Sequence, residues 1–488
     1  MSSYDIAVIG GGSAGLVVAI GAAQLGARVA LIERKALGGD CLYTGCVPSK
    51  TLIRSARFAA DLRRAEEFGF APAQLKFKDA SFAAITDRVQ RVIQTVGKRD
   101  EPERFRTMGI EVIFGKPRFL SSKELEIGVG EEATEAKHVV RARRFCIATG
   151  SHPAVPLIEG LKQTGFITNE EVFHLQKLPQ SLIILGAGPT GLELGQSFAR
   201  FGTQVTVVEM GERLLPREDE EVSALMEDLL RAERLTILLN TRAVAARGAN
   251  GHKKVTVECQ GQLQELHAEE ILVATGRLPN IEGLNLEAAG VKYDKERIIT
   301  NEYLRTSMPN IFAAGDVTGH FPFTHMAAYE AAVVVRNALF FWPLTQKADF
   351  RVVPWAVFTD PEVGRVGLTE REARGRFGDN EIRVYRSGFE ENDRAHADGE
   401  TNGFIKLICR GRKNEILGAH IVSTHAGELI HEIVLAMKHR LPATSLGSLI
   451  HVYPTRTQVN QRAGLEPIRA RLTPFTRKVL AQYFSWRR

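Results

Sequence analysis

The sequence is poor in cysteine and lacks long apolar runs, and each shortage excludes a class of protein. Five cysteines in 488 residues are too few, and odd in number, for a disulfide framework, which favours a reducing compartment. No apolar run approaches the ~18 residues that cross a bilayer, and the first residues show no secretory leader. We therefore expect a cytoplasmic protein. An apolar content of 44% with 25% charged residues excludes wholesale disorder.

The charge of the chain is unevenly placed. There are 63 basic and 57 acidic residues, a net charge of +6, and residues 469–488 carry six of the basic residues and no acidic one. The rest of the chain is formally neutral, and we expect no nucleic-acid partner. Apolar residues recur near helical spacing in 469–488, which is typical of a basic amphipathic helix on anionic lipid at the inner face of a membrane. A helix packed on its own domain, or a frayed terminus, is the alternative.

A strand, a glycine loop, a helix and a second strand occur twice along the chain, near residues 4–33 and 181–209. In both copies an acidic residue lies 18 positions after the third glycine. Two such units predict two mononucleotide-binding βαβ folds. The first comprises Gly10, Gly12, Gly15 and Glu33 and closes at Gly150; the second comprises Gly186, Gly188, Gly191 and Glu209 and closes at Gly276.

The spacing gives each loop a chemical role. The glycines allow a tight turn and a close approach to a pyrophosphate at a helix N-terminus, and the acidic residue binds a ribose hydroxyl. Glu209 favours NADH over NADPH, because a carboxylate repels a 2′-phosphate, although Arg213 could partly compensate.

The remaining pattern predicts the domain organisation. Helices are expected near 46–68 and 80–107, with short strands from 111 to 144. After residue 348 the pattern changes to a mixture of strands and helices, which predicts a separate α+β domain. The expected strands lie near 351–358, 382–389, 403–409 and 415–422, and the expected helices near 368–376 and 424–440. We expect an α/β protein with two Rossmann-like domains and a C-terminal α+β domain. The expected boundaries are 1–152 with 277–348, then 153–276, then 349–468, then a tail at 469–488.

Cys41 and Cys46 are five positions apart in a glycine-rich stretch at the start of a predicted helix. A helix N-terminus lowers the pKa of a thiol, so the pair is suited to redox cycling or thiolate chemistry. Two buried structural cysteines are the alternative, and the lack of a second pair argues against a zinc site. We expect no metal site. Cys146, Cys259 and Cys409 lie in predicted strands, where they are expected to act as small buried hydrophobes.

The stretch 38–50, the two glycine loops and residues 313–316 together resemble the flavoprotein disulfide reductases, or pyridine nucleotide-disulfide oxidoreductases. The resemblance runs from residue 4 to about 466 and is nearest to the mercuric reductase-like and dihydrolipoamide dehydrogenase-like branch. It implies that the first loop binds FAD and the second the nicotinamide cofactor. It further implies that Cys46 faces the flavin and that Cys41 exchanges with the substrate.

The same resemblance implies three more roles. Lys50 and Glu193 match a pair that tunes the flavin, and Asp316 matches the residue that holds the ribityl chain. Members of the family are homodimers in which the C-terminal domain completes the partner's active site. We therefore expect a homodimer that acts on a small-molecule acceptor.

The chain departs from the family pattern near its C-terminus. Dihydrolipoamide dehydrogenases and glutathione reductases have an acid/base histidine where this chain has Tyr453, and an orienting glutamate where it has Gln458. A phenol with a pKa near ~10 is a poor base at neutral pH. His451 could substitute only if the backbone moved it by two positions. A tyrosine here is similar to mercuric reductase, but the chain lacks the paired C-terminal cysteines of that enzyme. Residues 392–396 resemble a segment of that branch, and a solvated loop is the expected structure.

Three functions remain open from the sequence. The first is an enzyme that passes electrons from NADH through FAD and the Cys41–Cys46 disulfide to a disulfide or another thiol-reactive acceptor. The second is a reductase of soft metal ions. The third, from another class, is a membrane-docked redox sensor with low turnover.

Overall fold

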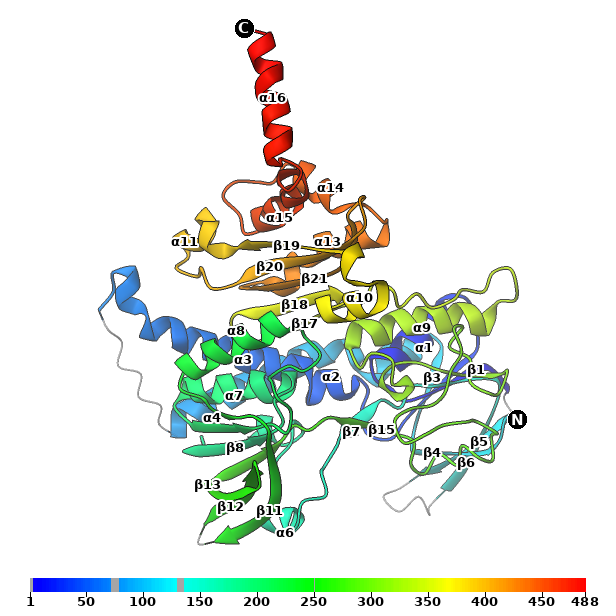
Figure 1. Cartoon of the computed structure of the whole chain (residues 1–488). Coiled ribbons are helices and arrows are strands. Elements are labelled where there is room, and N and C mark those ends of the chain that lie inside the picture. Colours follow the sequence, from blue (N-terminus) through cyan, green and yellow to red (C-terminus); the bar gives the residue numbers. More distant parts are fainter. Residues whose placement is uncertain (1–2, 72–78, 130–135, 250) are drawn as a thin grey trace. The chain divides into compact units, whose positions relative to one another are not determined.

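The computed structural model describes residues 3–71, 79–129, 136–249 and 251–488 (Figure 1). Its internal contacts divide the chain into two units. The first unit comprises Met1–Val208 and Thr241–Asp349, and the second comprises Glu209–Asn240 and Phe350–Arg488. The four-part division expected from the sequence stays a prediction.

The first unit contains a seven-stranded sheet built around the N-terminal strand. The strand order is β3-β2-β1-β6-β5-β4, and β16 pairs with β6. The strands β3, β2, β1, β6 and β16 run parallel, whereas β5 and β4 continue the sheet in antiparallel fashion. The bounds are β1 Ser3–Ile9, β2 Val29–Glu33, β3 Ile110–Phe114, β4 Lys116–Ser121, β5 Glu124–Val129, β6 Ala136–Ile147 and β16 Ile311–Ala313.

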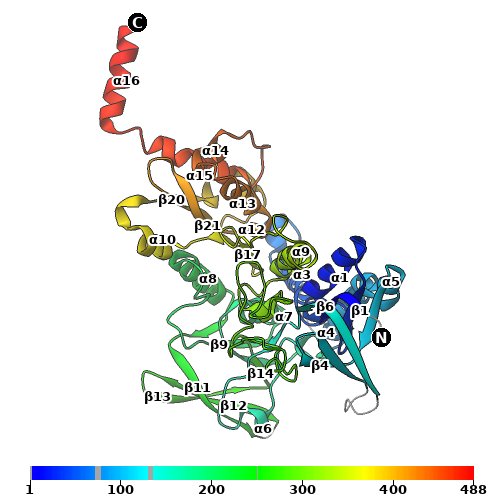
Figure 2. The same ribbon diagram turned by 90° about the vertical axis from the view of Figure 1, so that its right-hand side faces the viewer.

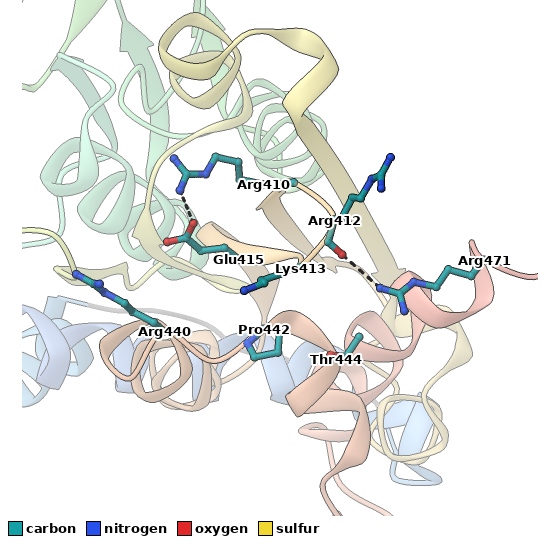
Figure 3. Close-up of a pocket in the computed structure, with 9 residues that line it drawn as sticks. Arg410, Arg412, Lys413, Glu415, Arg440, Pro442, Thr444 and Arg471 are labelled. Atoms are coloured by element: carbon teal, nitrogen blue, oxygen red, sulfur yellow. Dashed lines mark hydrogen bonds and ion pairs between the residues drawn. The ribbon is translucent and has the colours of Figure 1, made fainter.

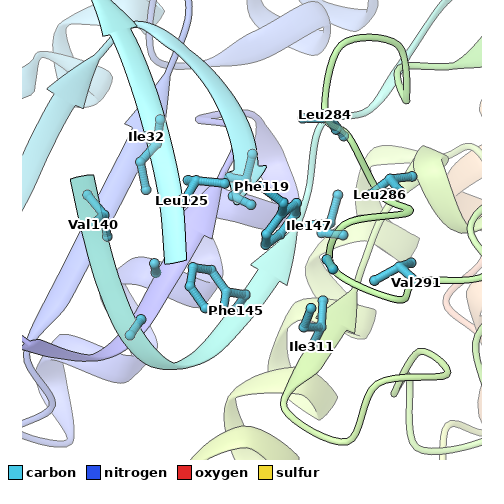
Figure 4. Packing of buried hydrophobic residues seen from close by; sticks show 14 of the residues in the cluster. Ile32, Phe119, Leu125, Val140, Phe145, Ile147, Leu284, Leu286, Val291 and Ile311 are labelled. Atoms are coloured by element: carbon cyan, nitrogen blue, oxygen red, sulfur yellow. The ribbon is translucent and has the colours of Figure 1, made fainter. Parts of the chain in front are cut away.

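One face of this sheet packs on a core that includes residues far along the chain (Figure 4). Phe119 and Phe145 meet edge to face with ring centroids 5.4 Å apart, and both are fully buried. Leu284, Leu286 and Val291 come from the segment after the second nucleotide unit and bury against the same cluster. This segment therefore packs on the seven-stranded sheet, and its burial helps to hold β16 beside β6.

A second parallel sheet in the same unit pairs β8 with β9 and with β14. These strands are β8 Ser181–Leu185, β9 Gln204–Val208 and β14 Glu270–Val273, and α7, Pro189–Phe201, follows β8. An antiparallel sheet of β11 Thr241–Ala249, β12 His252–Cys259 and β13 Gln262–Ala268 follows in the chain (Figure 2). The short strands β7, Ser151–Pro153, and β15, Arg277–Pro279, pair antiparallel.

The helices of the first unit lie close to where the sequence places them. The expected helix near 46–68 is α3, Cys46–Arg63, followed by a short 3₁₀ turn. The expected helix near 80–107 is two helices, α4 Asp79–Gly97 and α5 Pro102–Thr107. The chain also forms α1 Ser13–Gln24, α2 Gly39–Tyr43, α6 Leu161–Thr164 and α9 Thr324–Leu339.

The second unit contains a five-stranded antiparallel sheet in the order β17-β18-β21-β20-β19. Its strands are β17 Pro354–Val357, β18 Glu362–Gly367, β19 Ile382–Gly388, β20 Phe404–Arg410 and β21 Glu415–Ser423. The strand β18, second in this order, was not among the expected strands. The helices and the short strand β10 of this unit are α8 Glu220–Ala232, β10 Thr236–Leu238, α10 Glu370–Phe377, α11 Asp393–Ala397, α12 Ala426–Leu429, α13 His431–Lys438, α14 Ala443–Ser448, α15 Gln458–Arg469 and α16 Pro474–Trp486.

The architecture confirms the predicted fold class, with two Rossmann-type βαβ units and a C-terminal α+β part. None of the helices in the described part of the chain combines the length and the apolar character needed to cross a bilayer.

Candidate active site

The first glycine loop joins β1 to α1 through a turn that side chains would block. Gly10 has φ +107°, and its amide donates to the Ile32 carbonyl at 2.8 Å. A Cβ on Gly15 would lie 1.8 Å from the Gly10 carbonyl oxygen, so α1 can pack this closely on the strand only with glycine. Gly12 is the N-cap of α1 and has extended backbone angles.

The second glycine loop repeats this geometry between β8 and α7. The Gly186 amide donates to the Val208 carbonyl at 2.9 Å, and a Cβ on Gly191 would lie 2.2 Å from the Gly186 oxygen. Gly188 is the N-cap of α7 with extended backbone angles, as Gly12 is for α1. The internal repeat read from the sequence is therefore a repeat of local structure.

Two carboxylates lie at the carboxyl ends of strands beside the first loop. Glu33 accepts from the Gly11 amide at 2.7 Å and from the Lys35 amide at 2.8 Å. Asp316 follows β16 and accepts from the Ser151 hydroxyl at 2.6 Å. Burial raises the pKa of Asp316, and the Ser151 hydrogen bond opposes that rise.

Arg277 links Asp316 to the start of the cysteine stretch. Its guanidinium donates to the Ser151 hydroxyl at 2.7 Å and lies 3.3 Å from a carboxylate oxygen of Asp40 and 3.9 Å from one of Asp316. Asp40 precedes Cys41 in the chain, so one cation pairs with a carboxylate of the cysteine stretch and with Asp316. Gly150 and Gly276 lie in the turns after β6 and β14, both with positive φ.

These residues fit FAD. The first loop leaves the backbone amides at the N-terminus of α1 open to a pyrophosphate, because Gly12 carries no side chain there. Glu33 can accept from ribose hydroxyls, and the half-buried Asp316 can accept from the hydroxyls of a ribityl chain.

Cys41 and Cys46 lie on two consecutive helices. Cys46 is the first residue of α3, and Cys41 lies in α2. The Cys46 sulfur lies 3.4 Å from the Thr324 hydroxyl at the start of α9. Cys46 is exposed and Cys41 half-buried, and both are free thiols here.

The surroundings of the two thiols drive their acidities apart. The hydrogen bond from Cys41, followed by that from Thr324 and the charge of Lys50, lowers the pKa of Cys46 to about 6 against the opposing effect of burial. The same hydrogen bond, with burial, raises the pKa of Cys41. At neutral pH the reduced pair therefore consists of a Cys46 thiolate and a protonated Cys41.

Lys50 lies one turn beyond Cys46 on α3. Its ammonium donates to a carboxylate oxygen of Glu193 on α7 at 2.8 Å, and the Glu193 side chain is only 7% exposed. The pair joins the cysteine helix to the helix that follows the second glycine loop. The sequence resemblance paired these residues, and the fold brings them into contact.

The comparisons with known proteins agree with this geometry. Residues 4–331 match the family model described as pyridine nucleotide-disulphide oxidoreductase, and residues 353–463 match the dimerisation domain of the same family. The chain belongs to this family. It is 35% identical to a mercuric reductase of Staphylococcus aureus over 463 residues, which cover 95% of this chain and 82% of that protein.

Two further relatives show how broad the similarity is. A dihydrolipoyl dehydrogenase of Mycobacterium leprae is 35% identical over 473 residues, covering 94% of this chain and 97% of that protein. The Cu(II) complex of RclA, a HOCl-induced flavoprotein disulfide reductase of Escherichia coli, superimposes with a TM-score of 0.83 at 28% identity, covering 95% of this chain and 99% of that structure. The chain is thus an enzyme of the pyridine nucleotide-disulphide oxidoreductase family, whose members use FAD and a nicotinamide nucleotide.

The C-terminal residues of this family member lie in the second unit. The Tyr453 hydroxyl donates to a carboxylate oxygen of Asp393 at 2.9 Å, and the ring is 66% exposed. This hydrogen bond raises the pKa of Tyr453, which makes the phenol a still weaker acid. The nearby Gln458 accepts from the Thr455 amide at 3.4 Å.

His451 faces a different carboxylate. Its Nε2 lies 3.0 Å from Glu432, and Glu432 also accepts from Asn460 at 2.8 Å. His451 thus has the orienting carboxylate expected of an acid/base histidine, while Tyr453 stands at the position of that histidine in the sequence pattern.

Glu209 directly follows β9 and accepts from the Gly211 amide at 2.8 Å. Arg213, the residue that could compensate for its charge, lies 3.3 Å from Glu220 and donates to the Pro216 carbonyl at 3.0 Å. The arginine is therefore already bound to a carboxylate.

The other cysteines lie in the predicted strands, Cys146 in β6, Cys259 in β12 and Cys409 in β20. Cys146 and Cys409 are buried as expected, and burial raises the pKa of each to about 12. Cys259 is only half-buried, so the expectation of full burial was wrong for it.

The sequence did not point to two residues of the site. Thr324 and Arg277 reach the cysteine stretch only because the fold returns distant segments to it. Asp393 was placed in a solvated loop, which was wrong: residues 393–397 form α11, with Asn392 as its N-cap accepting from the Ala395 amide at 3.0 Å. An asparagine before a short run of helix formers is the local signal for that cap.

Proposed function

We propose that this enzyme transfers two electrons from NADH through FAD to the Cys41–Cys46 pair, and from the pair to a disulfide or another thiol-reactive acceptor. The observation that carries the proposal is the split acidity of the pair, with the pKa of Cys46 lowered to about 6 beside a protonated Cys41. A dithiol arranged in this way can give up two electrons and reform a disulfide.

FAD, when bound, supplies two-electron transfer between a nicotinamide hydride and the disulfide. Gly10, Gly12, Gly15 and Glu33 would hold its nucleotide end, and Asp316 its polar chain. Lys50 keeps positive charge beside the Cys46 thiolate, and Glu193 fixes the position of that charge at 2.8 Å.

The acceptor step follows thiol–disulfide exchange. Cys41 loses its proton and attacks one sulfur of the acceptor, which forms a mixed disulfide and releases the first thiol. The Cys46 thiolate then attacks the Cys41 sulfur, which releases the second thiol and closes the Cys41–Cys46 disulfide. Two protons must reach the departing thiolates, one from Cys41 and one from solvent. Tyr453 and His451 are the two candidates to relay them.

We propose that this relay comes from a second copy of the chain, in a homodimer formed through the dimerisation domain. The match of residues 353–463 to that domain supports the proposal. NADH is the preferred donor in this account, because Glu209 offers a carboxylate and Arg213 is engaged with Glu220.

A second candidate is the reduction of a soft metal ion held by the thiolates of Cys41 and Cys46. Tyr453 favours it, since a phenol bound to Asp393 is a poor proton relay and metal reduction needs no leaving thiol. The names of two relatives, a mercuric reductase and a Cu(II) complex of RclA, also support this candidate.

An anaerobic acceptor screen tests both candidates. The purified flavoenzyme is given NADH or NADPH with lipoamide, glutathione disulfide, quinones or soft metal ions, and oxidation of the nucleotide is followed. Turnover with any disulfide or metal should disappear in Cys41→Ala. Full turnover in Cys41→Ala with its best acceptor would overturn the proposal.

A further inference from the structure

The C-terminal helix α16, Pro474–Trp486, buries no residue and lies beyond the end of the family match at residue 463. Its aromatic residues are open to solvent: Phe475 is 76% and Trp486 92% exposed. Thr473 caps its N-terminus by accepting from the Thr476 amide at 3.2 Å. The segment is thus a formed helix with large apolar side chains exposed, a feature that needs a binding partner to explain it.

The side chains of α16 separate into two faces at 100° per residue. Phe475, Val479, Tyr483 and Trp486 fall within about 80° of one another around the helix axis. Leu480 and Phe484 extend this apolar side to about half of the circumference, and Arg487 falls within it between Tyr483 and Leu480. The opposite arc carries Arg477, Lys478 and Arg488 with Gln482 and Ser485. A short helix with aromatic residues on one face and basic residues on the other is suited to lie in the plane of a lipid interface.

A basic cavity of about 540 Å³ lies next to the start of this helix (Figure 3). Five basic side chains line it, and Glu415 is the single acidic residue among the described residues of the lining. Glu415 accepts a hydrogen bond from Arg410 at 2.6 Å. Arg471 connects the cavity to the helix. It lies two residues before Thr473, the N-cap of α16, and it lines the cavity, where its guanidinium donates to the Arg412 carbonyl at 3.3 Å. The basic lining residues are Arg410, Arg412, Lys413, Arg440 and Arg471.

We propose that α16 and this basic cavity form one docking surface for an anionic lipid bilayer. The apolar stripe of α16 lies among the acyl chains near the headgroups, and the cavity receives lipid phosphates. Charge complementarity selects this occupant, because residues 469–488 carry six basic residues and no acidic one. The inference is independent of the redox chemistry and does not use any residue of the candidate active site.

Flotation with phosphatidylcholine vesicles, with and without phosphatidylglycerol, tests the proposal on the full flavoenzyme. Binding should need the anionic lipid and weaken as salt is added. The variant Arg477→Ser/Lys478→Ser should bind about 30-fold more weakly, from about 1 kcal/mol per basic residue near such a surface. The charge-matched control, Lys162→Ser/Lys177→Ser, removes two exposed lysines from the other unit and should bind as the wild type does.

Separate variants test the two parts of the surface. Phe475→Ala/Trp486→Ala keeps the helix and all of its charges, and this variant should lose most of the binding to vesicles. Arg412→Ser/Lys413→Ser removes two basic residues of the cavity and should weaken vesicle binding by about 30-fold. Lipids brominated in their acyl chains quench a tryptophan that lies among those chains. They should therefore quench the tryptophan fluorescence of the wild type more than that of the Trp486→Phe variant.

Three outcomes would overturn the proposal. Equal binding to neutral and anionic vesicles would exclude the charge argument, and unchanged binding after deletion of 473–488 would exclude α16. The third outcome is an enzyme that never binds vesicles and whose oligomer mass, measured by light scattering, changes when 473–488 are deleted. That result would mean that α16 binds a second copy of the chain. All variants should keep wild-type NADH-dependent flavin reduction, which shows that they are folded.

Discussion

The Thr324 hydroxyl lies 3.4 Å from the Cys46 sulfur, although 278 positions of sequence separate the two residues. The contact places a hydrogen-bond donor at the start of α9 against the thiol at the start of α3. Together with the Cys41 thiol and Lys50, it stabilises the Cys46 thiolate. The reactive state of the pair thus depends on three elements that meet only in the folded chain.

The first prediction concerns the pH dependence of Cys46. In the anaerobic dithiol enzyme, alkylation of Cys46 should rise with pH around a midpoint near 6, because the thiolate is lost as the pH falls through that value. Thr324→Val removes one donor and should slow alkylation at pH 6 by about tenfold. Mass spectrometry of iodoacetamide-labelled peptides gives both rates, with the deeply buried Cys146 and Cys409 as internal controls. A wild-type midpoint near the ordinary thiol value would contradict this account.

The second prediction concerns the Lys50–Glu193 pair. Lys50→Met leaves the Glu193 carboxylate, 7% exposed, without its cation at 2.8 Å and should lower the unfolding free energy by about 2 kcal/mol. The double variant Lys50→Met/Glu193→Gln removes the buried charge and should recover much of that loss. Urea unfolding measures both. A Lys50→Met variant as stable as the wild type would show that the ion pair does not stabilise the fold. Equal stability of the single and double variants would show that the loss does not come from the unpaired carboxylate.

A third prediction concerns proton relay at the C-terminal site. Tyr453→His with Gln458→Glu installs an imidazole and its orienting carboxylate, and should raise lipoamide turnover by about 10²-fold or more. Tyr453→Phe is the matched control, which removes the hydroxyl bound to Asp393 and should leave disulfide turnover low. Steady-state kinetics with NADH measure the effect. If His451 already serves as the relay, the double substitution will bring no gain and His451→Gln will abolish activity.

The fourth prediction concerns His420, which is fully buried in the second unit. Neither ring nitrogen has a hydrogen-bond partner among the described residues, and burial, followed by the charge of Arg365, lowers the pKa of His420 to about 3. In the unfolded chain the His420 ring takes up a proton below about pH 6.5, whereas in the folded protein it stays neutral there. The free energy of unfolding should therefore fall by up to about 1.4 kcal/mol for each pH unit below 6.5. The difference in unfolding free energy between wild type and His420→Leu should change with pH below 6.5 and stay constant above it. A difference that does not vary with pH would contradict the prediction.

The parts of the site that the sequence predicted are local in the chain. The glycine loops could be read because a strand, a turn and a helix follow within a few residues, and steric contacts such as that of Gly15 with the Gly10 carbonyl oxygen allow no other residue. Cys46 at a helix N-terminus was also predictable from neighbouring residues. The pairing of Lys50 with Glu193 came only from the family resemblance, since no local pattern joins them.

The parts that the sequence missed depend on segments that meet through the fold. Arg277 reaches Asp40 because β15 pairs with β7 beside the first glycine loop, and no spacing indicates that meeting. The strand β18 was missed because its alternation is interrupted: it is buried over four consecutive residues between two sheet neighbours. The helix α11, which begins at Asp393, was missed because a five-residue helix has too few turns for a periodic signal.

The most direct measurement is an anaerobic titration of the flavoenzyme with one equivalent of NADH, followed by absorption spectroscopy. The account predicts a long-wavelength band from the Cys46 thiolate beside the oxidised flavin, which fades as the pH falls below about 6. The band should be absent in Cys46→Ser and present in Cys409→Ser, the matched control on a buried thiol. A band that survives in Cys46→Ser, or no band in the wild type, would contradict the central claim that electrons reach the cysteine pair.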